Sequence, residues 1–325
     1  MAISAMGVHQ AARQSAQLFD IVCLAHAGLI ERIAPDVVCL SSHFQTFVDN
    51  SVMRTPRKNL FLLSGSEEDH MYPGKFGLIF SLLLTGSAMT TDLTDIKSVD
   101  ICSGTSLTKF TGTYYVTQDN AVISNMEIHG QIVIQAKNVT MSNVKLVANT
   151  WHALWVQDGS TGFTLKDSEI DGGGSSQNGV LGQGTFLRNN IHGVENGIAV
   201  TGPSVIRDNY IYGLQGGPDA HFDGIEINGG HDIDIIHNTV INSHDQAAAV
   251  MMNNEFGGLA NINVDGNRLV GGGYTVYLDG RKGGGAVDDA SIKITNNQIG
   301  DGQWGNFAFY DENPVVYGNT PLCHR

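Results

Sequence analysis

The segment 221–227, His-Phe-Asp-Gly-Ile-Glu-Ile, places three ionisable side chains close together in the chain. Imidazole and carboxyl groups are the side chains that most often give or take a proton at a reacting atom. Glu226 stands between two isoleucines, and such alternation turns the apolar neighbours inward and the residue between them outward. A further carboxylate, Asp245, follows in the next polar stretch. We therefore take His221, Asp223, Glu226 and Asp245 as candidate catalytic residues.

Aromatic and basic residues are candidates for holding a ligand beside these groups. Trp155 and Tyr277 each stand between apolar residues of an alternating segment, so both should point outward as Glu226 does. Outward rings offer stacking faces, although half-exposed strand residues often have no such role. Arg281 and Lys282 form an adjacent basic pair in a chain whose formal net charge is −14. The candidate binding residues are therefore Trp155, Tyr277, Arg281 and Lys282.

A repeat, apolar-x-x-Asn-x-apolar, predicts the elements that position these residues. It recurs around Asn189, Asn209, Asn238, Asn267 and Asn297, with a truncated copy at Asn319. In the earlier copies, Met126, Val144 and Ser168 take the Asn position. An alternating strand follows most units, glycine and asparagine separate the strands, and helical patterns are nearly absent.

Parallel strands without helical crossovers must themselves coil. The repeat therefore predicts an all-β fold, a parallel β-helix over residues 105–320 with about nine rungs. Asparagines that stack at one corner hydrogen-bond from rung to rung, which explains the asparagine column without a role in function.

The longest steps of the repeat mark where loops leave the coil. Asn209, Asn238, Asn267 and Asn297 lie 29, 29 and 30 residues apart. The extra residues fall in four segments: 212–221, 242–246, 253–261 and 280–289. Loops on a rigid scaffold commonly carry function, so we expect a site where these four segments meet.

The rung pattern of residues 105–320 resembles the pectin-lyase-like superfamily, whose members include pectate lyases, polygalacturonases, alginate epimerases and phage tailspikes. The resemblance implies a right-handed coil, a polysaccharide as partner, and a substrate that lies along the outer face of one sheet. It does not decide the chemistry, because one fold carries many activities.

The segment around Asp223 resembles the Asn-Thr-Asp-Gly stretch of polygalacturonases, where the aspartate belongs to a hydrolytic carboxylate cluster. Asp223 matches that aspartate, and Asp245 matches the first of the family's paired aspartates. Gln246 stands where the second, the general acid, is expected, and glutamine has no proton to give. Residues 271–273 are all glycine where the family has Gly-His-Gly, and its Arg-x-Lys signature is absent. A polygalacturonase-like glycoside hydrolase is therefore one alternative.

The reaction class that we expect is β-elimination or C5 epimerisation of a uronate. Both reactions need a base that removes the proton at C5 and a group that neutralises the carboxylate. His221 or Lys282 would be the base, and Arg281 would bind the carboxylate through its fork of donors.

Calcium is the alternative neutralising group. Carboxylate oxygens are the ligands that Ca²⁺ prefers, and Asp219, Asp223 or Asp245 would hold the ion. The segment Asp219-Ala220-His221 resembles the Asp-Pro-His of alginate epimerases, with alanine at the middle position. The sequence predicts no other cofactor.

Charge narrows the partners of this protein. A net charge of −14 argues against nucleic-acid binding, because phosphates must be neutralised by Lys and Arg. An acidic polysaccharide would need a local basic patch or a bound cation. A third alternative is a carbohydrate-binding or surface β-helix protein without catalysis, in which His221, Asp223 and Glu226 only cap a rung.

The N-terminal part carries the pattern of an export signal. Residues 71–88 combine a lysine, an apolar run and small residues, which is typical of a signal peptide and too short for a membrane span. We expect residues 1–70 to be an extension outside the mature protein, residues 89–104 to be a cap or linker, and the protein to be secreted or periplasmic. Cys102 and Cys323 flank opposite ends of the repeats and should not pair unless the tail runs back along the coil.

Overall fold

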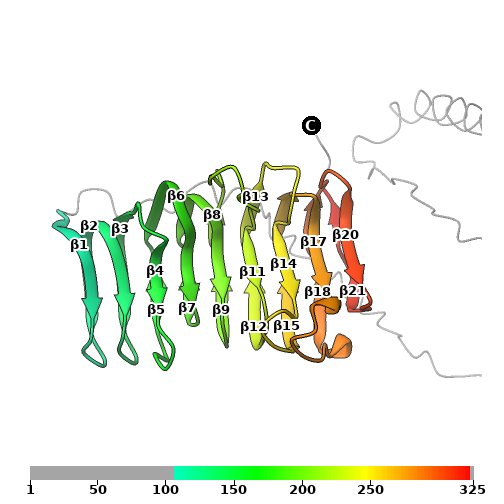
Figure 1. Ribbon diagram of the computed structural model, residues 1–325, viewed down its shortest axis with the longest axis horizontal. Helices are drawn as coiled ribbons and strands as arrows, with labels where there is room; N and C mark the ends of the chain where they lie inside the picture. Colours follow the sequence, from blue (N-terminus) through cyan, green and yellow to red (C-terminus); the bar gives the residue numbers. More distant parts are fainter. Residues whose placement is uncertain (1–105, 323–325) are drawn as a thin grey trace, which may run out of the picture. The chain divides into compact units, whose positions relative to one another are not determined.

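A computed structural model describes residues 106–322. Within this range the chain forms strands and two short 3-10 helices, and every pairing between named strands is parallel. The strands wind into a right-handed parallel β-helix (Figure 1), which confirms the predicted fold class. The expectations for residues 1–70, 71–88 and 89–104, and for Cys102 and Cys323, lie outside the described residues. No helix in residues 106–322 has the length and apolar character needed to cross a bilayer.

The strands make three faces, each a parallel ladder along the coil. The first face holds β5 (Thr164–Lys166), β7 (Thr185–Leu187), β9 (Ser204–Arg207), β12 (Gly230–Ile236), β15 (Leu259–Asp265), β18 (Ile292–Thr295) and β21 (Val315–Tyr317). The second holds β10 (Tyr210–Ile211), β13 (Thr239–Asn242), β16 (Arg268–Gly271), β19 (Gln298–Gly300) and β22 (Thr320–Pro321). The third holds β4 (His152–Val156), β11 (Ile225–Ile227), β14 (Val250–Asn253), β17 (Tyr274–Asp279) and β20 (Gly305–Tyr310). Longer strands bend through more than one face: β1 (Thr108–Val116), β2 (Val122–Ile134), β3 (Thr140–Val147), β6 (Glu169–Gly182) and β8 (Asn190–Val200).

Inward apolar residues of successive rungs stack in columns and form the core. On the third face Leu154, Val180, Ile198, Ile225 and Val250 follow one another in register, and all are fully buried. Burying one such side chain stabilises the fold by about 1.5–3 kcal/mol. A slip of one residue would turn each column outward, so the alternation in the sequence also sets the register.

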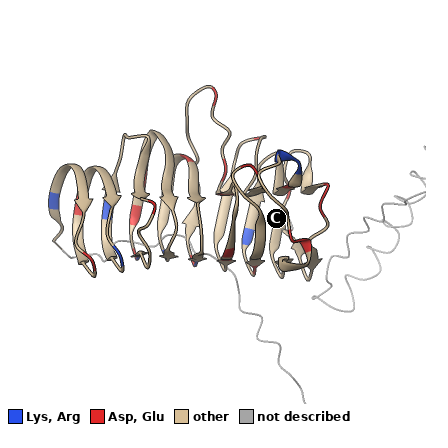
Figure 2. Ribbon diagram, turned by 60° about the horizontal axis from the view of Figure 1, so that its bottom comes forward, with Lys and Arg blue, Asp and Glu red and all other residues tan. Residues whose placement is uncertain are grey.

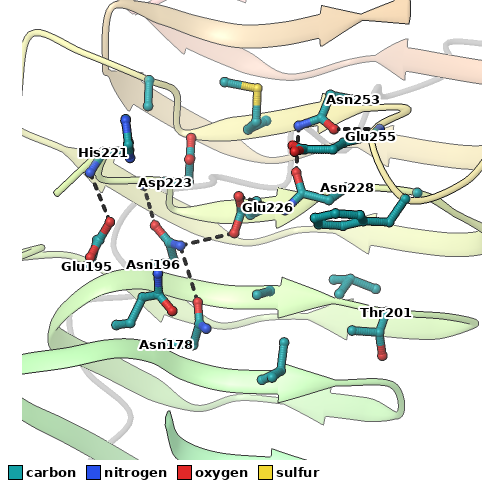
Figure 3. A pocket seen from close by; sticks show the side chains of 18 of the residues that line it. Asn178, Glu195, Asn196, Thr201, His221, Asp223, Glu226, Asn228, Asn253 and Glu255 are labelled. Carbon is teal, nitrogen blue, oxygen red and sulfur yellow. Dashed lines mark hydrogen bonds between the residues drawn. The ribbon is translucent and has the colours of Figure 1, made fainter. Parts of the chain in front are cut away.

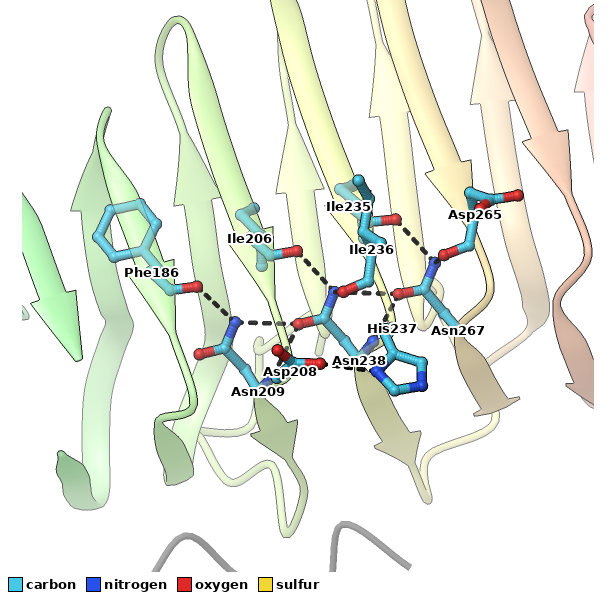
Figure 4. Close-up of polar contacts among 10 residues, drawn as sticks. All are labelled: Phe186, Ile206, Asp208, Asn209, Ile235, Ile236, His237, Asn238, Asp265 and Asn267. Carbon is cyan, nitrogen blue, oxygen red and sulfur yellow. Dashed lines mark hydrogen bonds and ion pairs between the residues drawn. The ribbon is translucent and has the colours of Figure 1, made fainter. Parts of the chain in front are cut away.

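The predicted asparagine column forms at the turn between the first and second faces (Figure 4). From Asn209 to Asn297, each Oδ1 accepts hydrogen bonds from the backbone N and the Nδ2 of the preceding asparagine, at 2.7–3.0 Å. Each Nδ2 also donates to a carbonyl one rung back, as Asn238 does to Ile206 at 2.8 Å. Before the asparagines begin, the Ser168 hydroxyl takes the same place and accepts from the backbone N of Val144. The column thus satisfies buried polar groups that water cannot reach.

The residue before each of these asparagines adopts a left-handed conformation, with φ between 51° and 65° at Arg188, Asp208, His237, Gly266 and Asn296. This conformation turns the chain sharply from the first face to the second. Side chains here also pair between rungs: His237 Nδ1 lies 2.7 Å from Asp208 Oδ1 (Figure 4).

Long loops leave the coil where the longer steps predict them. Residues 212–224 join β10 to β11, residues 243–249 join β13 to β14, and residues 254–258 join β14 to β15. The connection from β17 to β18 contains η1 (Gly280–Lys282) and η2 (Asp289–Ser291). Figure 2 shows acidic segments along most of the coil and few basic ones.

Replacing Asn238 by leucine tests the asparagine column. The substitution leaves the buried backbone N and Nδ2 of Asn209 without their acceptor, so the free energy of unfolding should fall by about 1–3 kcal/mol. Urea unfolding measures the change, and Asn149→Leu, at an exposed asparagine, is the matched control. Equal stability of the two variants would contradict a structural role for the column.

Candidate functional site

A groove of about 850 Å³ runs over the third face, across β8, β11, β14 and β17 (Figure 3). His221, Asp223, Glu226, Tyr277 and Lys282 line it, so five of the eight candidate residues from the sequence come together. The loops 212–224 and 254–258 supply His221, Asp223, Glu255 and Phe256. The groove therefore lies where the long rungs were expected to meet.

Strand register places Glu226 on the groove floor. Glu226 pairs with Ala199 on one side and Met251 on the other, and Met251 pairs with Tyr277, as the alternation predicts. Trp155 belongs to the same outward column but pairs with Leu181 farther along the coil, and it does not line the groove. Glu226 is half-buried between these neighbours.

Two amides hold the Glu226 carboxyl in place (Figure 3). Asn196 Nδ2 donates to Oε2 at 3.0 Å, and Asn228 Nδ2 donates to Oε1 at 2.8 Å. Asn228 in turn accepts from Asn253 Nδ2, and Asn253 Oδ1 accepts from the backbone N of Glu255. Burial raises the pKa of Glu226, and the Asn228 bond opposes this while the charges of Glu195 and Glu255 add to it. Both oxygens are thus oriented, and the carboxyl retains its proton to a higher pH than an exposed glutamate does.

Asp223 lies beneath the groove surface with 4% of its area exposed. The structure buries it at the end of the 212–224 loop, two residues before β11 begins. Its Oδ1 accepts from the backbone N of Ala248 at 3.1 Å. Burial, then the charge of Glu226, raises its pKa well above the usual value for aspartate, against the effect of the Ala248 bond.

One asparagine connects the two acids. Asn196 Oδ1 accepts from the backbone N of Asp223 at 3.1 Å, while its Nδ2 reaches both Glu226 and Asn178. Sequence reasoning missed Asn178 and Asn196, although a signal was present. Asn178-Gly179-Val180, Asn196-Gly197-Ile198 and Asp223-Gly224-Ile225 share one pattern and one register, so Asp223 is the acid in an amide column.

His221 lies at the end of the groove next to Asp223 (Figure 3). His221 is exposed. Its backbone N donates to Glu195 Oε1 at 3.0 Å. The following residue, Phe222, stacks on His244 with ring centroids 3.6 Å apart, which anchors the loop. Burial is the largest of the influences on the pKa of Glu226 and raises it, whereas a positive charge on His221 is the smallest and lowers it.

The structure separates the other candidates from this centre. Asp245 is exposed and lines a different hollow with His244 and Asp301. Arg281 donates to both oxygens of Asp279, at 2.8 and 2.9 Å, and its guanidinium lies 3.9 Å from the ring centre of Tyr310. Its fork of donors is therefore already engaged. Lys282 is the member of the basic pair that reaches the groove.

Tyr277 contributes an aromatic surface to the groove. Its ring centroid lies 5.2 Å from that of Tyr310, and burial together with the charge of Tyr310 raises the pKa of Tyr277 to about 12. The phenol therefore keeps its proton at neutral pH and acts as a hydrogen-bond donor.

The calcium set suggested by the sequence does not converge. Asp219 is exposed in the 212–224 loop, Asp223 is buried under the groove, and Asp245 faces the separate hollow. Among residues 106–322, no group of three or more His, Cys, Asp or Glu side chains is arranged to hold a metal ion. No step of the chemistry below is assigned to calcium.

Comparisons with solved structures find β-helix proteins. No family model and no curated protein matches the sequence. A mutant of the periplasmic alginate epimerase AlgG is 14% identical with a TM-score of 0.46, over 62% of this chain and 50% of that one. The A-module of the Azotobacter vinelandii mannuronan C-5 epimerase AlgE6 is 14% identical with a TM-score of 0.45, over 64% and 66%. The Dettilon tailspike protein is 12% identical with a TM-score of 0.39, over 68% and 56%.

The chain thus spans half the length of the AlgG structure that it matches. Similarity at this level says nothing of the ligand that this chain takes.

Asp223→Asn tests the burial of the acid through the pH dependence of stability. The folded state favours protonated Asp223, so the free energy of unfolding decreases as pH rises from the ordinary range of aspartate towards the raised pKa. Asparagine keeps the acceptor for Ala248 and cannot ionise. The melting temperature of the variant relative to wild type should therefore be higher at about pH 8 than at about pH 4. Asp245→Asn, at an exposed carboxylate, is the control. A change in the melting temperature of Asp223→Asn that is the same at both pH values would contradict the raised pKa of Asp223.

Proposed function

We propose that this protein is a carbohydrate-active enzyme that acts on an acidic polysaccharide by β-elimination or C5 epimerisation. The observation that carries the proposal is the meeting of two carboxyl groups of raised pKa, Asp223 and Glu226, with the exposed His221 in one open groove. Pairs of titratable groups with pKa values displaced by their surroundings are typical of acid–base sites.

In either reaction His221 is the base that removes the proton at C5 of a uronate. The protonated Glu226 carboxyl donates a hydrogen bond to the substrate carboxylate, which stabilises the negative charge that develops there. In elimination the C4–O4 bond then breaks, a C4–C5 double bond forms, and the departing oxygen takes the proton of the Asp223 carboxyl. In epimerisation the C4–O4 bond stays intact, and the Asp223 carboxyl gives its proton to C5 from the face opposite His221.

Lys282 supplies the local attraction that an acidic ligand needs. The groove also contains Glu195 and Glu255, whose charges oppose a polyanion. Lys282 is the one basic residue of Lys or Arg type among the groove-lining residues of the described chain. Its attraction for an acidic ligand weakens as salt is added, because the side chain is exposed and the interaction is screened.

Hydrolysis is the second candidate, and the number of carboxyl groups in the groove favours it. Glu195, Asp223, Glu226 and Glu255 all line the same space. A glycoside hydrolase needs one protonated carboxyl to release the leaving oxygen and one ionised carboxyl as base or nucleophile. The raised pKa of Asp223 or Glu226 suits the first role.

We also propose export, because residues 71–88 carry the pattern of a signal peptide. The enzyme would then meet polysaccharide outside the cytoplasm. Sequencing the N-terminus of the secreted protein tests this, and a mature terminus upstream of Met71 would refute it.

A screen against uronate and neutral polysaccharides tests the reaction. Ultraviolet absorbance of unsaturated uronates reports elimination, and NMR of the sugar protons reports epimerisation. New reducing ends without absorbance would establish the hydrolase instead. Binding without any of these changes would establish a carbohydrate-binding protein, and failure to bind any polysaccharide would refute the proposal.

Turnover by variants tests the assigned residues. His221→Ala, Asp223→Asn and Glu226→Gln should each lower kcat by about a hundredfold or more, the usual contribution of a general acid or base. Asp245→Asn should retain turnover, because Asp245 faces a separate hollow. Retained turnover in the first three variants, with melting curves that show folded protein, would remove these residues from the mechanism.

The two basic residues should act differently. Lys282→Ala should weaken binding of an acidic oligosaccharide at low salt and leave a neutral one unchanged. Arg281→Ala should instead lower the melting temperature, because it leaves the buried Asp279 carboxylate without its ion-pair partner. Calorimetric titration and thermal unfolding of both variants check this. A larger loss of binding in Arg281→Ala than in Lys282→Ala would mean that Arg281, and not Lys282, attracts the acidic ligand.

A further inference from the structure

Trp304 offers a ring face at the far end of the groove. It lines the groove and 62% of its area is exposed, although a large apolar side chain of this kind normally avoids water. Its backbone is fixed, since Trp304 N donates to Gly273 O at 2.8 Å and Gln303 N donates to Gly272 O at 2.8 Å. These bonds fix the point of the backbone from which the exposed ring projects.

A glycine supports the ring from beneath. A Cβ atom at Gly273 would lie 2.6 Å from Cζ3 and 2.9 Å from Cε3 of Trp304, closer than real contacts allow. The indole thus packs close to Gly273, while most of the Trp304 area remains exposed. The Trp304 and Tyr274 rings lie 5.8 Å apart between centroids, with 65° between their planes. This packing accounts for the glycine at position 273, whereas Gly271 and Gly272 adopt positive φ angles of 81° and 84°.

The ring lies at a defined distance from the acids. Register carries Ile225, two residues after Asp223, to Val250, then to Val276, and then to Phe307, three residues after Trp304. Three rungs of about 4.8 Å put Trp304 roughly 14 Å from the rung of Asp223. A ligand that touches both must therefore extend over several sugar units along the coil.

We propose that Trp304 is a sugar-binding platform that stacks on a pyranose ring of a glycan chain, remote from the reacting unit. The exposed indole suits the apolar face of a sugar ring. Trp304 lines the same groove as Asp223 and Glu226, so the ligand that we infer for it is the saccharide proposed for that groove. The inference rests on the proposed function only in taking a saccharide as ligand. It makes the protein selective for long chains over short ones.

Binding of oligouronates of increasing length to the full protein tests the platform. The chain has three tryptophans, so a hexasaccharide that stacks on Trp304 should change the tryptophan fluorescence, and Trp304→Ala should abolish this change. The affinity of Trp304→Ala for the hexasaccharide should be about tenfold weaker, as expected for loss of one stacked ring, while disaccharide binding stays the same.

Gly273→Ala is a second variant that keeps the tryptophan and moves it. The new methyl group displaces the indole, so hexasaccharide binding should weaken without any change at Trp304 itself. Tyr317→Ala is the matched control, because Tyr317 is 60% exposed but lies on β21 of the first face. Melting curves establish that each variant is folded.

The results separate this inference from the proposed function. Fluorescence-detected, Trp304-dependent binding without turnover would support the platform and refute the enzyme. Turnover with unchanged hexasaccharide affinity in Trp304→Ala would refute the platform alone. Equal losses for disaccharide and hexasaccharide would also refute it, because Trp304 would then support the acid centre rather than a remote unit. Absence of oligouronate binding in the wild type would overturn it as well.

Discussion

Buried amides that bind one another from rung to rung hold this protein in register. In the column from Asn209 to Asn297, each side chain accepts hydrogen bonds from two donors of the rung before it and donates to a carbonyl there. A buried donor or acceptor left without a partner costs about 1–3 kcal/mol, so a rung that slipped would lose several such bonds at once. The coil therefore has one register, and every outward column is set by it.

The groove uses the same interaction for another purpose. Asn196 and Asn228 hold the two oxygens of Glu226, and Asn253 continues the chain of amides to the backbone of the next loop. At the corner between the first and second faces an amide column only stabilises the coil, whereas the amides of the groove orient the Glu226 carboxyl. In the column that contains Asn178 and Asn196, Asp223 stands in place of an asparagine and puts a second acid beside Glu226. Burial is the main cause of the raised pKa of Asp223. The pair of carboxyl groups with raised pKa is thus a local modification of a structural amide column.

Charge explains why the two members of the basic pair, Arg281 and Lys282, have different surroundings. Asp279 is buried and engages both donors of the Arg281 fork, because an unpaired charge there would be costly. No buried carboxylate requires Lys282, the next residue, as its partner, and this lysine lines the groove. The aromatic residues Tyr277 and Trp304 line the same groove and offer ring surfaces, whose contacts do not depend on charge. Charged and aromatic side chains are therefore placed along one line on the third face.

The sequence by itself determined the coil and much of the site. The apolar-x-x-Asn-x-apolar repeat and the alternating strands define the rungs, because their periods are local properties of a strand and a turn. They also predict the outward column of Glu226, Met251 and Tyr277 and the loops that surround it. Only the tertiary structure decided that Asp245 faces another hollow, that Asp279 engages Arg281, and that Trp304 rests on Gly273. Loops have no period, and these contacts join residues from different rungs, so their side-chain positions depend on the packing of the whole coil.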